Sequence, residues 1–505
     1  MISRLGPSSS LSDLAQPFSF CIFQTLFEQK AGGNDPIFMA TRFVNLDHDT
    51  PLLLPPNLRD WVPEDHLVHF ILDAVDGLDL RQVRVNTRGT GSEQYPPRML
   101  LGLLIYSYAT GTFSSRRIEQ STHDHVPVRL LTADTHPDHD TICTFRRENL
   151  ALINESFVKV LQLAQQLKLL QFGQLTVAAD GTKVLAHASK HSAVSYARAG
   201  EQIAQLELEV EQLLAKAESA DATPLQDGLR IPAEITRRQE RKAALAQARA
   251  EIEARAQARY AVQLAEHETK LAARAAKKER GEKVGGNPPQ APTPEPQPKD
   301  QYNFTDPESR IMKAGGGQHF EQSYNAQAAV EVESRLIVGQ CVSQSPNDKQ
   351  ELVPTLAAIP AEAGPVVAAL VDSGFFSEKA VTQIERAADG TPTGTVVYAA
   401  VEKTGHHRTV ADLEKKPEPA APAADASVTA LMRHRLKTAA GQAIYKLRQQ
   451  TVEPVFGIIK SVLGFRQFRL RGRAKAALEW TLVCLAYNLK RLHRLGAGLK
   501  LALPA

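Results

Sequence analysis

A charged stretch near the middle of the chain constrains the fold more than any other feature. Residues 197–283 are dominated by Ala, Glu, Lys, Arg, Leu and Gln. Their apolar positions recur three and four residues apart, as at Ile203, Leu206, Val210, Leu213 and Leu214. This spacing predicts long helices or a coiled coil, with a hairpin break near residues 224–232. The proline-rich residues 285–298 then predict an extended or disordered linker, so residues 197–299 form an insertion in a globular domain.

Strand patterns lie on both sides of this insertion. Before it, residues 174–180 form a short apolar run rich in strand formers, which ends at Asp180. After it, the pattern predicts an antiparallel hairpin at 324–332 and 336–343, a helix at about 348–359, a strand at 365–372, a helix at about 377–387 and a strand at 395–400. This order predicts an α/β domain with a mixed sheet (α+β for the chain overall), and it is compatible with an RNase H-like sheet.

Two of the expected strands end in an aspartate followed by a turn of small residues. These residues are Asp180 and Asp372. Ligands of open α/β sheets collect beyond the carboxyl ends of the strands, so neighbouring strands would bring the two carboxylates together. Magnesium prefers such hard oxygen ligands. The plain alternative is that each aspartate is only a turn or cap residue.

A third carboxylate, Glu453, is the only acid between residues 433 and 475. The bases of that window are Arg433, Arg435, Lys437, Lys446, Arg448, Lys460, Arg466, Arg469, Arg471, Arg473 and Lys475. One acid among so many bases suits a metal ligand beside a track for phosphates. Pro454, directly after the glutamate, predicts a helix start or a local irregularity. Phe465 and Phe468 lie between the bases and are expected in the core, with stacking on flipped nucleobases as the alternative.

The N-terminal part reads as helices from about residue 60 to 170. A polar turn at 137–141 leads into a helix that carries Arg146 and Arg147, which is the layout of a helix-turn-helix recognition helix. An ordinary helical bundle with a basic solvated face is the alternative. Residues 1–38 precede the patterned sequence, and they are expected to be a disordered stretch or an extension from a start codon placed too early.

Together, six stretches resemble the DDE transposases of bacterial insertion sequences. The resemblance is to the group that has a helical N-terminal transposase domain and a DDE domain interrupted by a long insertion. The stretches are Arg42–Asp47, Tyr95–Gly102, Val177–Lys183, Tyr302–Ser309, Leu370–Phe376 and Tyr445–Gly457, and they extend over nearly the whole chain from Met39.

This resemblance implies a helical DNA-binding domain at residues 39–170 and an RNase H-like catalytic domain at 171–196 and 300–495. It implies that Asp180, Asp372 and Glu453 are the catalytic acids and hold two Mg²⁺ ions, with Mn²⁺ able to replace them. Tyr445, Arg448 and Lys460 match the residues that accompany the third acid and are expected to bind DNA. Some relatives place the arginine four residues before the glutamate rather than five, and Lys446 is then a substitute.

The implied activity is metal-dependent cleavage at the ends of a mobile element, followed by strand transfer. The implied partners are double-stranded DNA with terminal inverted repeats, target DNA and a second copy of the chain in the synaptic complex. A catalytically inactive DNA-binding derivative and an RNase H-like nuclease without strand transfer are the alternatives. A coiled-coil scaffold would leave the acids and the basic C-terminal part unexplained.

Composition and cysteine spacing indicate where in the cell the protein is expected to act. The four cysteines are scattered without a CxxC pair, which predicts reduced thiols in a cytosolic protein. No apolar run approaches the roughly 20 residues of a spanning helix, so no membrane partner is expected. We therefore expect a cytoplasmic, nucleoid-associated protein. His406 and His407 are expected in a loop, the glycines at 315–317 in a flexible turn, and Asp306 and Glu308 without a catalytic role.

Overall fold

The computed structural model describes residues 57–80, 83–84, 94–222, 230–281, 286–314, 319–401, 418–423 and 426–496. The expected N-terminal extension, His406, His407 and the glycines at 315–317 lie outside these residues. No helix among the described residues is long and apolar enough to cross a membrane.

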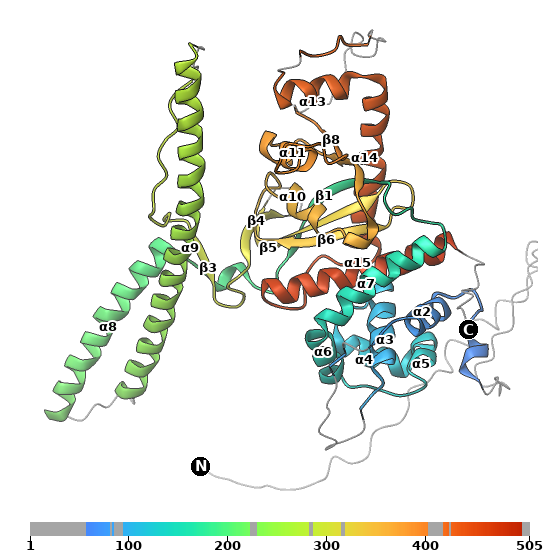
Figure 1. Cartoon of the computed structure of the whole chain (residues 1–505). Coiled ribbons are helices and arrows are strands. Elements are labelled where there is room, and N and C mark those ends of the chain that lie inside the picture. Colours follow the sequence, from blue (N-terminus) through green and yellow to red (C-terminus); the bar gives the residue numbers. More distant parts are fainter. Residues whose placement is uncertain are drawn as a thin grey trace, which may run out of the picture. The chain divides into compact units, whose positions relative to one another are not determined.

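A group of helices precedes the sheet. They are α2 (Leu67–Asp76), α3 (Pro97–Ala109), α4 (Ser115–Asp124), α5 (Val126–Leu131), α6 (His139–Glu148) and α7 (Leu150–Gln166). Helix α3 begins with prolines at its first turn, where no backbone N–H is needed, and its residues from Leu100 to Ala109 are all buried. Asp138 caps α6 by accepting the backbone N–H of Thr141 at 2.6 Å. Helices α2, α5 and α6 pack against this buried α3 (Figure 1).

The central sheet is mixed. Its strands are β1 (Leu175–Leu185), β4 (Arg310–Ala314), β5 (His319–Glu331), β6 (Ile337–Ser343), β7 (Val366–Val371) and β8 (Val396–Ala399). The order is β4-β5-β1-β7-β8, and β6 also pairs with β5. Strands β1 and β5 are antiparallel, whereas β7 runs parallel to both β1 and β8. The predicted α/β class with a mixed sheet and a helical N-terminal region is confirmed, and the arrangement is consistent with an RNase H-like domain.

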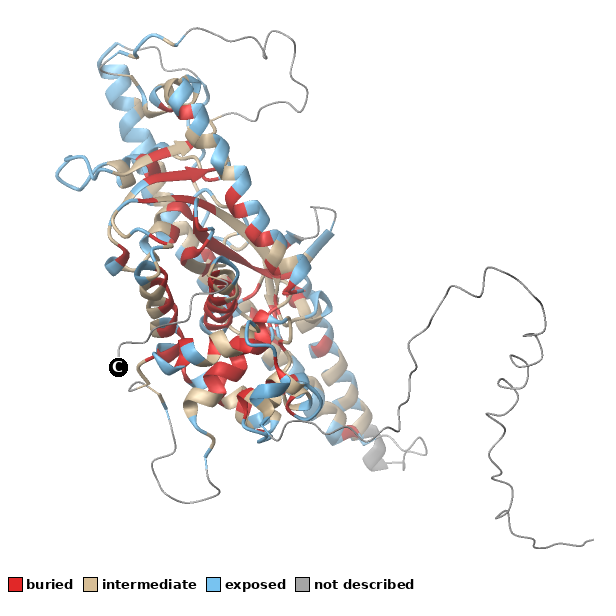
Figure 2. Cartoon of the chain, turned by 90° about the vertical axis from the view of Figure 1, so that its right-hand side faces the viewer, coloured by how far each residue is buried: buried red, intermediate tan, exposed pale blue. Residues whose placement is uncertain are grey.

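Helices cover both faces of the sheet. They are α10 (Leu352–Ala357), α11 (Glu378–Glu385), α13 (Val428–Lys437), α14 (Ala439–Gly457), the π-helical turn η5 (Ile458–Val462) and α15 (Arg473–Leu495). Every residue of α15 from Leu478 to Leu489 is buried, because this helix packs against β6 on one side and against α3 and α7 on the other. The buried residues accordingly gather in the sheet and in the helices beside it (Figure 2).

The expected insertion contains two long helices, α8 (Tyr196–Ala222) and α9 (Ile231–Glu279), and α8 packs against the first part of α9 (Figure 1). The short strands β2 (Ala193–Ser195) and β3 (Gln301–Asn303) pair at its base. A small separate core joins these elements, made of Val194, Ala199, Leu206, Leu245 and Ala248. The proline-rich segment runs without regular structure and contacts α9, where His267 donates to the Pro289 carbonyl at 3.1 Å. The helical prediction holds, and the expected break falls between the two helices.

Candidate active site

Strands β1 and β7 bring Asp180 and Asp372 side by side. In the parallel register Ala178 pairs with Leu370, so the next residues on the same face are Asp180 and Asp372. Asp372 follows the end of β7, as expected. The prediction for Asp180 needs a correction, because β1 continues past it to Leu185. Strand β1 continues because its residues up to Leu185 pair with β5, beyond the point where β7 has ended. The Asp180 carboxylate therefore projects from the middle of the strand.

The Asp180 carboxyl lies in a poorly solvated position. Its side chain is 22% exposed, and its Oδ1 accepts the backbone N–H of Gly181 at 2.8 Å. Burial raises the pKa of Asp180 to about 7, the Gly181 N–H opposes that rise, and the negative charge of Asp372 adds to it. Because the rise comes mainly from burial, a cation bound beside this carboxyl would offset the cost of charging it away from water.

Glu453 lies on α14, the helix that packs against β1 and β7. Arg448 lies between the acids: its Nη2 is 3.2 Å from Glu453 Oε1, and its Nη1 is 3.9 Å from Asp180 Oδ2. The Arg448 side chain is 13% exposed and Glu453 is 53% exposed. The guanidinium thus links the first and third acids as a shared cation.

Pro454 lies inside α14 and not at its start, which corrects one of the two interpretations of this residue. Its missing N–H leaves the carbonyl one turn earlier without the usual helical bond. The helix changes to the π-helical turn η5 four residues later. The alternative interpretation, a local irregularity beside Glu453, agrees with this geometry.

Tyr445 and Lys460 attach this helical region to the sheet. Tyr445 donates its hydroxyl to the carbonyl oxygen of Val371 at 3.1 Å, one residue before Asp372. Lys460 Nζ donates to the carbonyl oxygen of Lys183 at 2.8 Å. Burial lowers the pKa of Lys460, and the positive charges of Lys183 and Arg466 lower it further. Both side chains therefore hold the backbone of the strands that carry Asp180 and Asp372. That either side chain contacts DNA stays a prediction.

Asp348 is a neighbour of the site that the sequence patterns did not reveal. It lies in the turn before α10, and its Oδ1 accepts hydrogen bonds from Asn325 Nδ2 at 2.6 Å and Gln327 Nε2 at 2.8 Å, with Lys183 Nζ 3.3 Å away. This cluster covers the face of β1 opposite to Asp180. A Cβ at Gly181 would lie less than 3 Å from the side-chain ends of Gln327, Asp348 and Asn325, so a larger residue here would require these side chains to move. The only sequence signal was the Pro346-Asn347 turn after β6.

The expectation that Arg146 contacts DNA is wrong. The residue is 3% exposed, and its Nη1 donates to the Tyr108 hydroxyl at 2.8 Å and to the Phe113 carbonyl at 3.0 Å. Its guanidinium is therefore part of the interior. Arg147 lies at the surface beside Glu148, at 3.7 Å. Phe465 and Phe468 are fully buried, which agrees with the expected core placement.

The three acids have the donor atoms that a divalent cation prefers, but they do not form a closed set of ligands. Within the described ranges, no group of three or more His, Cys, Asp or Glu side chains stands close enough to hold a metal ion. The oxygen donors are nevertheless of the type that magnesium takes, and Asp180 and Asp372 adjoin on one face. Burial, with the charge of Asp372, raises the pKa of Asp180, and the opposing charge of Arg448 does not cancel that rise.

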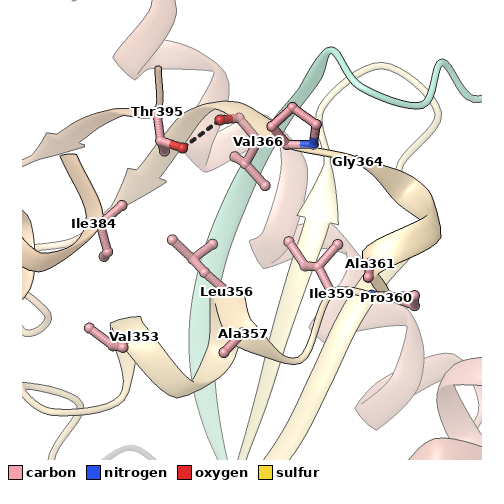
Figure 3. Close-up of a pocket in the computed structure, with 11 residues that line it drawn as sticks. Val353, Leu356, Ala357, Ile359, Pro360, Ala361, Gly364, Val366, Ile384 and Thr395 are labelled. Carbon is pink, nitrogen blue, oxygen red and sulfur yellow. Dashed lines mark hydrogen bonds between the residues drawn. The ribbon is translucent and has the colours of Figure 1, made fainter. Parts of the chain in front are cut away.

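A hollow of about 300 Å³ lies elsewhere on the sheet, at the start of β7 (Figure 3). Apolar side chains such as Val353, Leu356 and Ile384 line it, and Thr395 donates its hydroxyl to the Val366 carbonyl at 2.7 Å at its rim. Because its lining contains no ionisable side chain, this hollow offers no group for acid–base or metal chemistry.

Comparison with known families matches two segments of the chain. Residues 56–148 match a transposase domain (DUF772), and residues 418–493 match a transposase DDE domain. The second segment includes Tyr445, Arg448, Glu453 and Lys460, whereas Asp180 and Asp372 lie outside both. No curated protein and no solved structure matches the chain.

Proposed function

From these two matches, which support a DDE transposase of insertion-sequence type, we propose that the chain cuts DNA at the ends of a mobile element and joins the freed ends to new DNA. The observation that carries the proposal is the meeting of Asp180 and Asp372 on one face of the sheet, opposite Glu453 on α14. Transposases act on DNA, and strand transfer is the finer part of the proposal.

The three acids would hold two magnesium ions. Bound magnesium would activate the attacking oxygen, first of water and then of the DNA 3′-hydroxyl, and would stabilise the departing oxygen. Mn²⁺ would serve in the same position. Tyr445 fixes the backbone of Val371 and so sets the direction of Asp372. Arg448 keeps Asp180 and Glu453 near each other by its shared charge and is placed to contact a phosphate.

The active complex would contain at least two copies of the chain, because two element ends must be held together while both are cut. Its partners would be double-stranded DNA with terminal inverted repeats and the target DNA. The protein would act in the cytoplasm, on the bacterial nucleoid.

Asp372→Ala tests the proposal. Magnesium-dependent nicking of a duplex that carries the element end should fall by about three orders of magnitude or more, because a ligand for the charge developing at the phosphate is lost. Binding of the same duplex should remain, since the Asp372 carboxylate accepts its hydrogen bond from the nearby Gly374 N–H. Asp389→Ala is the matched control, because this exposed acid lies in a turn with Thr391.

Two results would contradict the assignment: nicking that persists in Asp372→Ala, or a loss of DNA binding while nicking remains. The reaction products of the wild-type protein distinguish a transposase from a nuclease without strand transfer. Joined end–target molecules are expected from a transposase, and nicked DNA alone would restrict the activity to hydrolysis.

A further inference from the structure

The chain between η5 and α15 runs beside the end of β1. The backbone N–H of Leu185 donates to the Arg466 carbonyl at 3.1 Å, and the N–H of Phe468 donates to the Leu185 carbonyl at 2.8 Å. Gln467 adds a side-chain bond to the Ala186 carbonyl at 3.1 Å. This segment is therefore fixed to the same strand that carries Asp180.

Side chains along this segment divide by chemistry. Phe465, Phe468 and Leu470 are buried. The basic side chains between and after them are exposed; we call them the arginine ridge, comprising Arg466, Arg469, Arg471, Arg473 and Lys475. No residue of the sequence between Pro454 and Leu478 is acidic. Among the described residues, no ion pair joins any member of the ridge to a carboxylate.

The acids that do lie near the ridge contact its backbone. Glu479 Oε2 accepts the N–H groups of Arg469 and Leu470, at 2.7 and 3.0 Å. Asp306 Oδ1 accepts the N–H of Gly472 at 3.3 Å, and Glu308 Oε2 accepts the N–H of Arg473 at 2.9 Å. These carboxylates hold the path of the chain and leave the guanidinium groups facing outward. The matched stretch at Tyr302–Ser309 thereby acquires a structural role, and no catalytic one.

The ridge connects with the candidate active site. Arg466 Nε donates to the Lys460 carbonyl at 3.0 Å, and Arg471 Nε donates to the His187 carbonyl at 3.2 Å. Burial lowers the pKa of His187, and the charges of Arg471 and Arg469 lower it further. Positive charge that local acids leave uncompensated thus extends from the ridge to the end of β1.

We infer that the arginine ridge is the docking surface for the phosphate backbone of duplex DNA beside the cleavage position. This inference rests on the proposed function. Leu185 follows Asp180 by five positions in β1, which is about 16 Å of extended chain, or about five base pairs along a duplex. A row of cations held on a fixed backbone suits a regular polyanion better than a single acidic group. The ridge contributes to the affinity for DNA and fixes the position of the duplex, but it does not recognise the base sequence.

Salt-dependent binding tests the ridge. The variant R469A/R471A/R473A keeps every backbone N–H that the carboxylates hold. Its affinity for a 30-base-pair duplex of random sequence, measured by fluorescence anisotropy without magnesium, should fall by about tenfold or more at 100 mM salt. The slope of log affinity against log salt should shrink by about 1 for each phosphate that is no longer neutralised. The matched control K270A/K277A/K278A removes equal charge from α9 and should bind as the wild type does.

Unchanged affinity and slope in the ridge variant would overturn the inference, and so would an equal loss in the control. If the triple variant fails to fold, R471Q should lower both the affinity and the salt slope, by a smaller amount. Polyglutamate that competes as well as duplex DNA at equal charge would assign the ridge to an acidic protein and overturn the DNA assignment. Asp372→Ala separates the two proposals: it should bind DNA normally, so its failure to stop cleavage would reject the proposed function and leave the ridge result standing.

Discussion

At the scale of single residues, Asp180 and Gly181 serve the two faces of one strand. Asp180 faces α14 and Arg448, and Gly181 leaves space for Asp348 and its amide partners on the other face. The sequence predicted the acid and the small residue after it from a strand-end pattern. It could not predict that β1 continues, because that depends on pairing with β5 more than a hundred residues later.

Glu351 provides a prediction on pH at a residue outside the candidate site. The residue is 7% exposed, and its carboxyl accepts a hydrogen bond from the Ser343 hydroxyl at 2.6 Å. Burial raises the pKa of Glu351 above 4.5, and the charge of Asp348 adds to the rise. The folded state therefore holds this proton more tightly than the unfolded state, so the stability it contributes is lost as the pH rises through the folded pKa.

Glu351→Gln should remove that loss. The melting temperature of the variant relative to the wild type should be higher at pH 8 than at pH 5, measured by thermal unfolding at both values. Glu362→Gln, which replaces an exposed acid, is the control. If the melting temperature of the variant relative to the wild type is instead lower at pH 8 than at pH 5, the charged form of Glu351 stabilises the fold and the prediction is wrong.

At the scale of elements, helix α14 decides where Glu453, Arg448 and Tyr445 point. Thr438 caps its start by accepting the Gly441 N–H at 3.0 Å, and Pro454 disturbs its end. The sequence predicted the irregularity from the proline but could not place it inside the helix. That placement depends on packing against β1 and β7, which a local pattern does not contain.

Two glycines of α14 give opposite predictions for the same substitution. A Cβ at Gly441 would overlap the carbonyl oxygen of Arg435, whereas a Cβ at Gly457 would meet nothing within 4 Å. Gly441→Ala should lower the free energy of unfolding by about 2 kcal/mol or more. Gly457→Ala should raise it by about 0.5–1 kcal/mol, because its backbone is already helical.

Urea denaturation of both variants measures these changes. A stable Gly441→Ala variant would mean that the turn from α13 into α14 can shift without loss. A destabilised Gly457→Ala variant would mean that the π-helical turn needs glycine at its start.

At the scale of the whole molecule, a buried polar network joins the N-terminal helices to α15. Tyr108 donates its hydroxyl to Glu479 Oε1 at 2.8 Å and accepts from Arg146 at 2.8 Å. Burial raises the pKa of Glu479, and Arg146 opposes that rise. The sequence pattern placed Arg146 on a DNA-binding helix because basic residues on a helix do not reveal which face is buried. The expected domain boundaries at 170 and 300 stay predictions.

Tyr108→Phe should destabilise the protein by about 1–3 kcal/mol, because it leaves buried charged groups of Glu479 and Arg146 short of a partner. Tyr95→Phe is the control, since that hydroxyl makes an exposed bond to the His136 carbonyl at 3.2 Å. Calorimetry should show a single cooperative transition in the wild type. Equal melting of the two variants would show that the network does not couple the helices to α15.

Binding of Mn²⁺ followed by electron paramagnetic resonance tests most directly whether the three acids act as one metal site. Wild-type protein should bind Mn²⁺, and D180A/D372A/E453A should lose that binding. A control that removes three exposed acids of α9, E240A/E268A/E279A, should keep it. Retention of wild-type Mn²⁺ binding by D180A/D372A/E453A would contradict the proposal that these carboxylates form the catalytic centre.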